Sequence, residues 1–246
     1  MHVWLTFPER VTDERVLAQC RAVLAAEEHT ATERFVFARH RHQHLLTRAL
    51  IRDLLSRYTG ESPTAWRFER NRYGRPEIAS PGQWQHLRFN LSHADGLIAC
   101  AITLQRDVGV DVEPVGRSTD VLDLAPRVFS PRELDDLHRL DANEQRQRFF
   151  ALWTLKESYI KARGMGLSLP LDKFTFTFAG DRAVAIEIDP ALQDNAATWQ
   201  FERGSVEERH AIALAVRRST ADPLLRVSYA TTVPFMTAMR SSIRIG

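Results

Sequence analysis

Two acidic side chains separated by one residue lie in an alternating segment near the middle of the 246-residue chain. In Val108-Gly-Val-Asp-Val-Glu113 the valines and the acids occupy opposite faces of an extended strand, because successive side chains alternate. Asp111 and Glu113 therefore point the same way, about 6.6–6.8 Å apart along the strand. Carboxylate oxygens in this arrangement suit a hard divalent ion such as Mg²⁺. An ordinary half-exposed strand shows the same alternation, so the segment alone leaves both interpretations open.

A third carboxylate and two ammonium groups lie in a segment with helical spacing. Trp153, Glu157 and Lys161 are four residues apart and share one face of the expected helix, with Lys156 at its edge. The alternative is an ordinary surface ion pair between Glu157 and Lys161. Lysine usage weakens that alternative, since 30 of the 33 basic residues are Arg and two of the three Lys lie here. A compact ammonium is not readily exchanged for a planar guanidinium where it contacts a phosphate or an active-site carboxylate.

Ser92 and His93 form a third candidate element, in Phe89-Asn-Leu-Ser-His-Ala-Asp95. They stand where a strand is expected to give way to a loop containing Gly96, a position that favours function. Both side chains can hydrogen-bond a phosphate, although a Ser-His pair also occurs in ordinary turns. A serine hydrolase is disfavoured, because no G-x-S-x-G elbow surrounds Ser92 and adjacent residues do not normally act as nucleophile and base.

Hydrophobic spacing predicts the elements that would position these residues. Helices are expected at 32–58, 130–138 and 145–162, and strands at 87–91, 97–104, 108–112, 174–178, 183–188 and 211–216. Gly60 and Gly164 are expected to end the first and last helices. Ser130 and Glu133 have the spacing of a capping box at the start of the second helix.

These elements predict an α+β fold made of two similar halves, because a helix or two followed by several strands occurs twice. The halves are expected to span residues 1–106 and 107–246 and to pack as an intramolecular pseudo-dimer, with a cleft between them where a site could form.

Composition limits the environment and the partners of the chain. A formal net charge of +2 gives no sign of a nucleic-acid partner. No uninterrupted apolar stretch is longer than Leu97 to Ile102, which is far shorter than the roughly 20 residues of a membrane helix. Cys20 and Cys100 show neither a zinc-site nor a disulfide spacing. We therefore expect a cytoplasmic monomer with neither a nucleic acid nor a membrane as partner.

The three chemistry-bearing segments occur in an order that resembles a known family. Phe-Asn-Leu-Ser-His, Gly-Val-Asp-Val-Glu and Trp-x-x-Lys-Glu-Ser-Tyr-Ile-Lys-Ala-x-Gly-x-Gly-Leu-Ser-Leu are similar to motifs of the 4′-phosphopantetheinyl transferase superfamily, in its larger, pseudo-dimeric Sfp type. The similarity is clearest from Phe35 to Leu171. It implies that the chain transfers the 4′-phosphopantetheine group of coenzyme A to a serine of an apo acyl or peptidyl carrier protein. It also implies dependence on Mg²⁺, with Mn²⁺ as a possible substitute, and release of 3′,5′-ADP.

Catalytic and metal-binding roles follow from this resemblance. Asp111, Glu113 and Glu157 match the metal-binding acids of the family, and Lys161 matches the lysine near the coenzyme A diphosphate. These four residues are the expected catalytic set. Glu157 is the candidate base for the serine proton, with Glu113 as the alternative.

The resemblance also implies contacts with coenzyme A. Ser92 and His93 match residues that contact its phosphates, and Arg75 matches a basic residue that holds the 3′-phosphate. Lys156 is a further candidate contact, unless it pairs with a neighbouring acid.

One departure from the family pattern affects the nucleotide site. Family members often carry basic residues where Glu28 and Ala31 stand here. Arg34, Arg39 or Arg41 could compensate, and Arg41 is included among the expected coenzyme A contacts.

The segment from Val121 to Leu137, with Val128 and Phe129 near its middle, resembles the region where family members meet their carrier protein. Two other functions stay open on sequence alone: a protein that binds coenzyme A or a nucleotide without turnover, and a Mg²⁺-dependent nuclease or phosphohydrolase.

Overall fold

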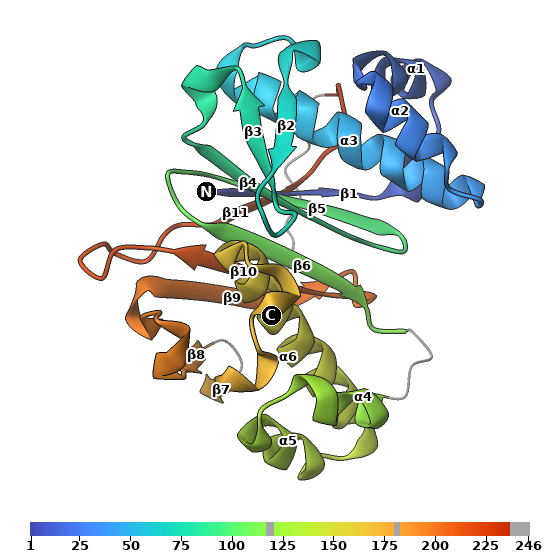
Figure 1. Cartoon of the computed structure of the whole chain (residues 1–246). Helices are drawn as coiled ribbons and strands as arrows, with labels where there is room; N and C mark the ends of the chain where they lie inside the picture. Colours follow the sequence, from blue (N-terminus) through green and yellow to red (C-terminus); the bar gives the residue numbers. More distant parts are fainter. Residues whose placement is uncertain (117–120, 180–182, 237–246) are drawn as a thin grey trace.

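The computed structural model describes residues 1–116, 121–179 and 183–236, which form two layers of sheet covered by helices (Figure 1). The elements that come first in the chain are β1 (His2–Thr6), α1 (Glu14–Val23), α2 (Ala26–Glu33), α3 (Ala38–Thr59), β2 (Arg67–Arg70), β3 (Pro76–Ser80), β4 (Leu87–Ala94) and β5 (Leu97–Leu104). The elements that follow are β6 (Val108–Pro114), α4 (Val121–Val128), α5 (Pro131–His138), α6 (Ala142–Arg163), β7 (Phe174–Ala179), β8 (Ala183–Ile188), β9 (Trp199–Val206), β10 (His210–Arg217) and β11 (Ser228–Thr231). Short 3-10 turns lie at Pro8–Arg10, Pro63–Ala65, Gly82–Trp84, Gly166–Ser168, Leu171–Lys173, Pro190–Leu192 and Ala196–Thr198.

The two principal sheets pack face to face. One has the strand order β11-β1-β5-β4 and the other β6-β10-β9, while β2-β3 and β7-β8 form separate hairpins. An apolar cluster fills the space between the principal sheets, with members that include Val3, Leu5, Ala99, Val108, Val110, Val112, Ile212 and Leu214. The valines of β6 thus face this shared core, as their alternation predicts, and the acids of β6 face the other way.

A long helix covers the outer face of each sheet, α3 on the first and α6 on the second (Figure 1). Each of these helices has 22 residues and ends at a glycine with positive φ, Gly60 at 78° and Gly164 at 63°. Only glycine adopts this conformation without steric cost, so the two glycines fix where the helices stop. The predicted α+β fold of two similar halves is confirmed.

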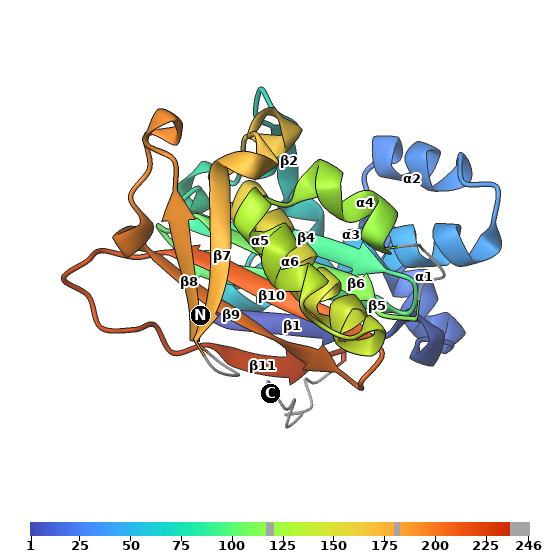
Figure 2. The same cartoon turned by 90° about the horizontal axis from the view of Figure 1, so that it is seen from below.

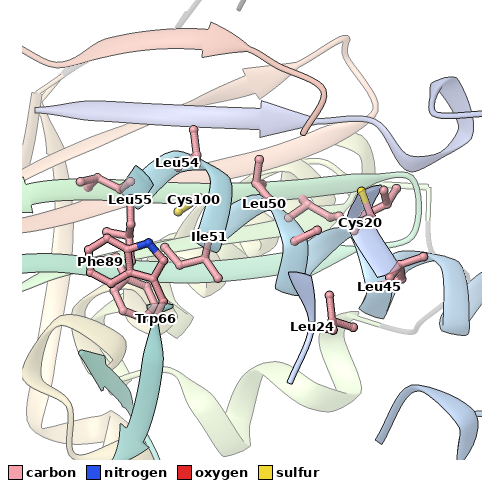
Figure 3. Close-up of a cluster of buried hydrophobic side chains, with 14 of the residues drawn as sticks. Cys20, Leu24, Leu45, Leu50, Ile51, Leu54, Leu55, Trp66, Phe89 and Cys100 are labelled. Atoms are coloured by element: carbon pink, nitrogen blue, oxygen red, sulfur yellow. The ribbon is translucent and has the colours of Figure 1, made fainter. Parts of the chain in front are cut away.

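Each half has its own core on the helix side of its sheet. In the first half, Trp66 and Phe89 pack against Ile51 and Leu55 of α3, and the free thiols of Cys20 and Cys100 are buried in the same cluster (Figure 3). In the second half, α4, α5 and α6 lie together over the sheet (Figure 2). No helix in the described residues is long and apolar enough to span a membrane.

The prediction that one long helix begins at Thr32 is wrong. Helix α2 ends at Glu33 and α3 begins at Ala38, so the run Arg34–Phe37 is a loop. The Arg41 guanidinium donates to the carbonyl oxygens of Phe35 and Val36 at 2.7 and 3.0 Å. It thereby satisfies backbone groups that the break in the helix leaves unpaired.

Strand β4 extends further than predicted. It pairs with β5 up to Ala94, so Ser92 and His93 belong to the strand rather than to a loop. The turn is confined to Asp95 and Gly96, where Gly96 has a φ of 83°. A two-residue hairpin turn needs such positive φ values, and glycine supplies one here.

The C-terminal part of the chain returns to the first sheet, and the expected split at residue 106 stays a prediction. Strand β11 pairs in parallel with β1, with Tyr229 opposite Val3. Residues 237–246 of the second predicted half lie outside the described residues.

Gly109 permits the closest approach between β6 and α6. A Cβ atom at this position would lie 2.0 Å from the carbonyl oxygen of Ser158 and 2.5 Å from the amide nitrogen of Ala162. No side chain fits at such distances, so only glycine lets the helix backbone rest on the strand. Glu157 and Lys161, which precede these two residues of α6, are thereby brought to the acidic face of β6.

Gly109→Ala is expected to lower the free energy of unfolding by at least about 1–3 kcal/mol, the usual cost of overpacking. Gly116→Ala is the matched control, because nothing lies within 4 Å of a Cβ atom there. Urea denaturation of both variants and the parent measures the effect. Equal stability of the two variants would contradict the tight contact.

Candidate active site

Ser92, Asp111 and Lys161 meet where β4, β6 and α6 come together. The Lys161 ammonium donates to Asp111 Oδ1 at 2.6 Å and to Ser92 Oγ at 2.9 Å, and the Ser92 hydroxyl donates to Asp111 Oδ1 at 2.9 Å. Asp111 is only 4% exposed, whereas the Lys161 side chain keeps 26% of its surface accessible. The three residues form a buried, charge-assisted cluster with one side open to solvent.

Side chains rather than a backbone ladder join β4 to β6 at this place. The two strands belong to different sheets, and Asn90 Oδ1 accepts a hydrogen bond from the Val110 amide at 2.9 Å. Ser92 Oγ accepts a longer one from the Val112 amide at 3.4 Å. Asn90 was not among the predicted site residues, although it alternates with the apolar Phe89 and Leu91, which indicates a polar face of β4.

Glu157 and Glu113 complete the acidic group around Asp111. Loss of water raises the pKa of Glu157, and the charges of Asp111 and Glu113 raise it further, against the opposing effect of Lys161. The Trp153 indole donates to Glu113 Oε1 at 3.1 Å and so orients that carboxylate. The carboxylates of Asp111, Glu113 and Glu157, which were predicted from two separate segments, are therefore close enough to interact electrostatically.

The donor types at this site fit a hard cation. Asp111 Oδ2 is buried and has no hydrogen-bond partner in the described part of the chain, which is costly for an acceptor. Three carboxylates with an unsatisfied oxygen are the kind of ligands that Mg²⁺ takes. The described ranges 1–116, 121–179 and 183–236 hold no ready-made group of three metal-ligating side chains.

Two pockets flank the cluster. The smaller has a volume of about 240 Å³ and is lined by Tyr73–Pro76, Asn90, Leu91, Glu157, Ile160, Lys161, Gly164 and Gly166. The larger has a volume of about 700 Å³ and is lined by His93–Asp95, Glu113–Gly116 and Glu208–His210. Lys161 of the cluster lines the smaller pocket, and His93, which follows Ser92 in β4, lines the larger one.

His93 lines the larger pocket. Desolvation of the imidazole lowers its pKa, and the Lys161 ammonium lowers the pKa further. The neutral ring that results can both donate and accept a hydrogen bond.

Comparison with known proteins identifies the family of this chain. Residues 107–215 match the family model described as the 4′-phosphopantetheinyl transferase superfamily, and residues 12–105 match the one described as 4′-phosphopantetheinyl transferase, N-terminal. The 4′-phosphopantetheinyl transferase HetI of Nostoc sp. is 32% identical over 182 residues, which cover 68% of this chain and 77% of that protein. This chain belongs to the 4′-phosphopantetheinyl transferase superfamily.

Other members of the superfamily are similar over most of the chain. The 4′-phosphopantetheinyl transferase Sfp of Bacillus subtilis is 32% identical over 188 residues, covering 76% of this chain and 81% of that protein. Among solved structures, a holo-(acyl-carrier-protein) synthase from Bacillus anthracis in complex with CoA (3′,5′-ADP) aligns with a TM-score of 0.40 and 16% identity. That alignment covers 46% of this chain and 96% of that one. The family resemblance inferred from the sequence is confirmed.

Arg75 reaches the smaller pocket, but its guanidinium already has protein partners. It pairs with Glu77 at 2.7 Å and Asp107 at 3.5 Å, and it donates to the carbonyl oxygen of Ala162 at 2.8 Å. A role with the coenzyme A 3′-phosphate, expected of this transferase family, therefore stays a prediction. Arg41 lines neither of the two pockets, because its guanidinium holds the loop before α3.

The prediction that Lys156 contacts coenzyme A is wrong. Its ammonium is completely buried, 2.8 Å from Glu133 Oε2, and donates to the carbonyl oxygens of Leu171 and Phe174 at 2.7 and 2.8 Å. Three acceptors use all three of its N–H groups, so none is left for a ligand. The alternative, pairing with an acid, is what the structure shows.

Glu28, the departure from the family pattern, has a structural role. It is buried, its carboxylate accepts a hydrogen bond from the Ala25 amide at 3.0 Å, and it pairs with the buried guanidinium of Arg52 at 2.7 Å. Arg52 stands at the same distance from the start of α3 as Lys156 does from the start of α6. Each half thus uses one glutamate in the first turn of a shorter helix, Glu28 in α2 and Glu133 in α5, to hold a buried cation of its long helix.

Lys156→Met is expected to destabilise the fold by about 3–5 kcal/mol, because it leaves the Glu133 carboxylate buried without its cation. Lys173→Met, which removes an exposed ammonium from a surface pair with Asp189, is the control and should change little. Chemical denaturation measures both. A Lys156 variant as stable as the control would refute the buried pair.

Proposed function

We propose that this chain transfers the 4′-phosphopantetheine group of coenzyme A to a serine hydroxyl of an apo acyl or peptidyl carrier protein, with 3′,5′-ADP as the leaving group. The observation that carries the proposal is the cluster of Ser92, Asp111 and Lys161 between two pockets, with Glu157 beside it. Membership of the transferase superfamily supports the same reaction.

The proposed reaction depends on stabilisation of the negative charge of the phosphates more than on covalent catalysis by the protein. The serine oxygen of the carrier attacks the β-phosphorus of coenzyme A, and the bond from that phosphorus to the bridging oxygen of 3′,5′-ADP breaks. Positioning and neutralisation of the growing negative charge account for most of the catalysis of such transfers. The partly exposed Lys161 ammonium provides positive charge on this path, and Ser92 and His93 provide hydrogen bonds to phosphate oxygens.

Glu157 is the proposed acceptor of the serine proton. Its pKa is raised by desolvation and by Asp111 and Glu113, which makes it a stronger base than an ordinary carboxylate. Glu113 is the less suited of the two, because the Trp153 indole donates to one of its oxygens.

Asp111, Glu113 and Glu157 are the residues that would hold Mg²⁺, or Mn²⁺ in its place. Such an ion supplies positive charge to a diphosphate and fixes its orientation. The buried, unpaired Asp111 Oδ2 supports this assignment, since that oxygen has no partner among the described residues.

The carrier protein is proposed to dock on α4 and α5, with one change to the residues expected there. Val128 and Phe129 pack into the second core, so they offer little apolar surface. Leu122 and Leu124 on α4 are exposed at 39% and 37% and are the better contacts. Both halves of the cleft come from one chain, so we propose a monomeric, cytoplasmic enzyme.

The proposal is tested by intact mass spectrometry of a purified apo carrier incubated with the chain, coenzyme A and Mg²⁺. A mass gain of one phosphopantetheine, absent with EDTA and with a carrier Ser→Ala variant, is the expected result. No gain with fatty-acid, polyketide and peptide carriers, despite measurable coenzyme A binding, would instead indicate a binding protein.

Asp111→Asn is expected to lower the transfer rate by at least about 100-fold. The substitution removes the negative charge that pairs with Lys161 and that would help to bind the metal ion. Asp222→Asn is the matched control, since Asp222 pairs with Arg106, accepts a hydrogen bond from the Ser219 amide and lines neither pocket, and it should keep the parent rate. Initial rates with a saturating carrier decide the point. Similar rates for both variants would remove Asp111 from the site.

A further inference from the structure

Charged side chains of alternating sign form a closed ring of contacts at the C-terminal end of α6. Asp194 lies 2.8 Å from Arg163 and 3.1 Å from Arg217. Asp107 lies 3.4 Å from Arg217 and 3.5 Å from Arg75. The Arg75 guanidinium closes the ring, because it donates at 2.8 Å to the backbone carbonyl of the α6 residue that precedes Arg163. The ring therefore begins and ends on the same turn of α6.

The members of the ring outside α6 come from four different parts of the chain. Arg75 lies in the turn between β2 and β3, Asp107 between β5 and β6, Asp194 between β8 and β9, and Arg217 at the end of β10. The end of the helix is thus tied to segments that are distant in the sequence. Asp107, Asp194 and Arg217 line neither of the two pockets beside the cluster.

Asp194 is the most buried member of the ring. Its side chain is only 3% exposed, and its Oδ2 also accepts hydrogen bonds from the Tyr159 hydroxyl at 2.7 Å and the Trp199 indole at 3.0 Å. Burial raises the pKa of Asp194, but Tyr159, a backbone amide and the two guanidinium groups outweigh burial and hold the pKa below its usual value. Such an ionised, multiply hydrogen-bonded carboxylate is held more firmly than an exposed ion pair.

The ring holds the side of α6 opposite to the catalytic cluster. Tyr159 and Arg163, which both contact Asp194, are four residues apart and share one face of the helix. Glu157 and Lys161 each precede one of them by two residues, which is about 200° around an α-helix. The contacts that fix Tyr159 and Arg163 therefore also fix the direction in which Glu157 and Lys161 point.

On the basis of the proposed function, we propose that Asp194 and Arg217 are positioning residues for the transfer reaction. They act through the end of α6, which they hold in the orientation that places Glu157 and Lys161 beside Asp111. A displacement of about 1 Å is enough to cost a catalytic group much of its effect, because stabilisation of the transition state depends on geometry. The ring therefore contributes to turnover and not to the binding of either substrate.

Arg217→Gln opens the ring at a side chain that is 35% exposed, so the variant is expected to fold. Its kcat for transfer to an apo carrier that the parent modifies is expected to fall about three- to tenfold. The KM values for coenzyme A and for the carrier are expected to stay within about twofold of the parent, since Arg217 lines neither pocket. Arg106→Gln is the matched control, because Arg106 is 30% exposed and pairs with Asp222 outside the ring, and it should keep the parent constants.

Asp194→Asn tests whether the ring acts as a unit. This substitution is expected to lower kcat about tenfold or more, because it breaks two links at the most buried member. Combining it with Arg217→Gln is expected to add less than about twofold, since a ring that is already open has lost its hold at the next link. Thermal melts set the assay temperature below the unfolding range of each variant.

Hydrogen exchange followed by mass spectrometry measures the hold of the ring on α6 without any reaction. In Arg217→Gln, the amides of residues 157–164 are expected to exchange several-fold faster than in the parent. The amides of α3, the long helix of the other half, are expected to exchange at the parent rate. Equal acceleration in both helices would show a general loss of stability and would overturn the proposal.

Parent-like exchange in α6 would also overturn the proposal, as would faster exchange with an unchanged kcat or with a rise in KM alone. A loss in the double variant equal to the product of the two single losses would show independent contacts instead of one ring. If the parent binds coenzyme A without transferring it, the proposed function fails. The exchange rates of α6 still decide in that case whether the ring holds the helix.

Discussion

The contact between Gly109 of β6 and the backbone of α6 is the constraint on which the site depends. Because the strand has no side chain there, the helix approaches close enough for Lys161 to reach Asp111 at 2.6 Å. The same approach crowds Glu157 against the other acids and shields it from water, which raises its pKa. One glycine therefore fixes both the geometry and the electrostatics of the cluster.

The duplicated plan of the chain explains why only one half carries this cluster. Both long helices place an acid and a base one turn apart after the buried cation, Asp53 and Arg57 on α3 and Glu157 and Lys161 on α6. In the first half, the C-terminal segment satisfies that pair: Arg57 donates to the carbonyl of Met236, and the Phe235 amide donates to Asp53. In the second half, the corresponding pair, Glu157 and Lys161, lines the smaller pocket instead.

The features that could be predicted from the sequence are those that depend on residues close together in the chain. The alternation in β6 and the four-residue spacing in α6 identified the acids and Lys161, and glycines identified the ends of both long helices. What it missed depends on residues distant in the chain. The burial of Lys156 follows from Glu133 on another helix, and the return of β11 to the first sheet has no local signal. The break before α3 was missed because the apolar spacing continues through it.

The residues that line the two pockets could not be predicted from the sequence either, because each pocket is built from several separate segments. Asn90 is an example. Its position between two apolar residues of β4 could be read from the sequence, but its hydrogen-bond partner, the amide of Val110, lies in a strand of the other sheet.

The measurement that tests the central claim most directly is the ratio of products in one reaction mixture. Chromatography quantifies 3′,5′-ADP released while mass spectrometry quantifies phosphopantetheinylated carrier over the same time course. The account predicts one 3′,5′-ADP for each modified carrier and no release without a carrier. Release of 3′,5′-ADP or phosphate in the absence of a carrier, at the rate seen in its presence, would show hydrolysis and contradict a transferase site.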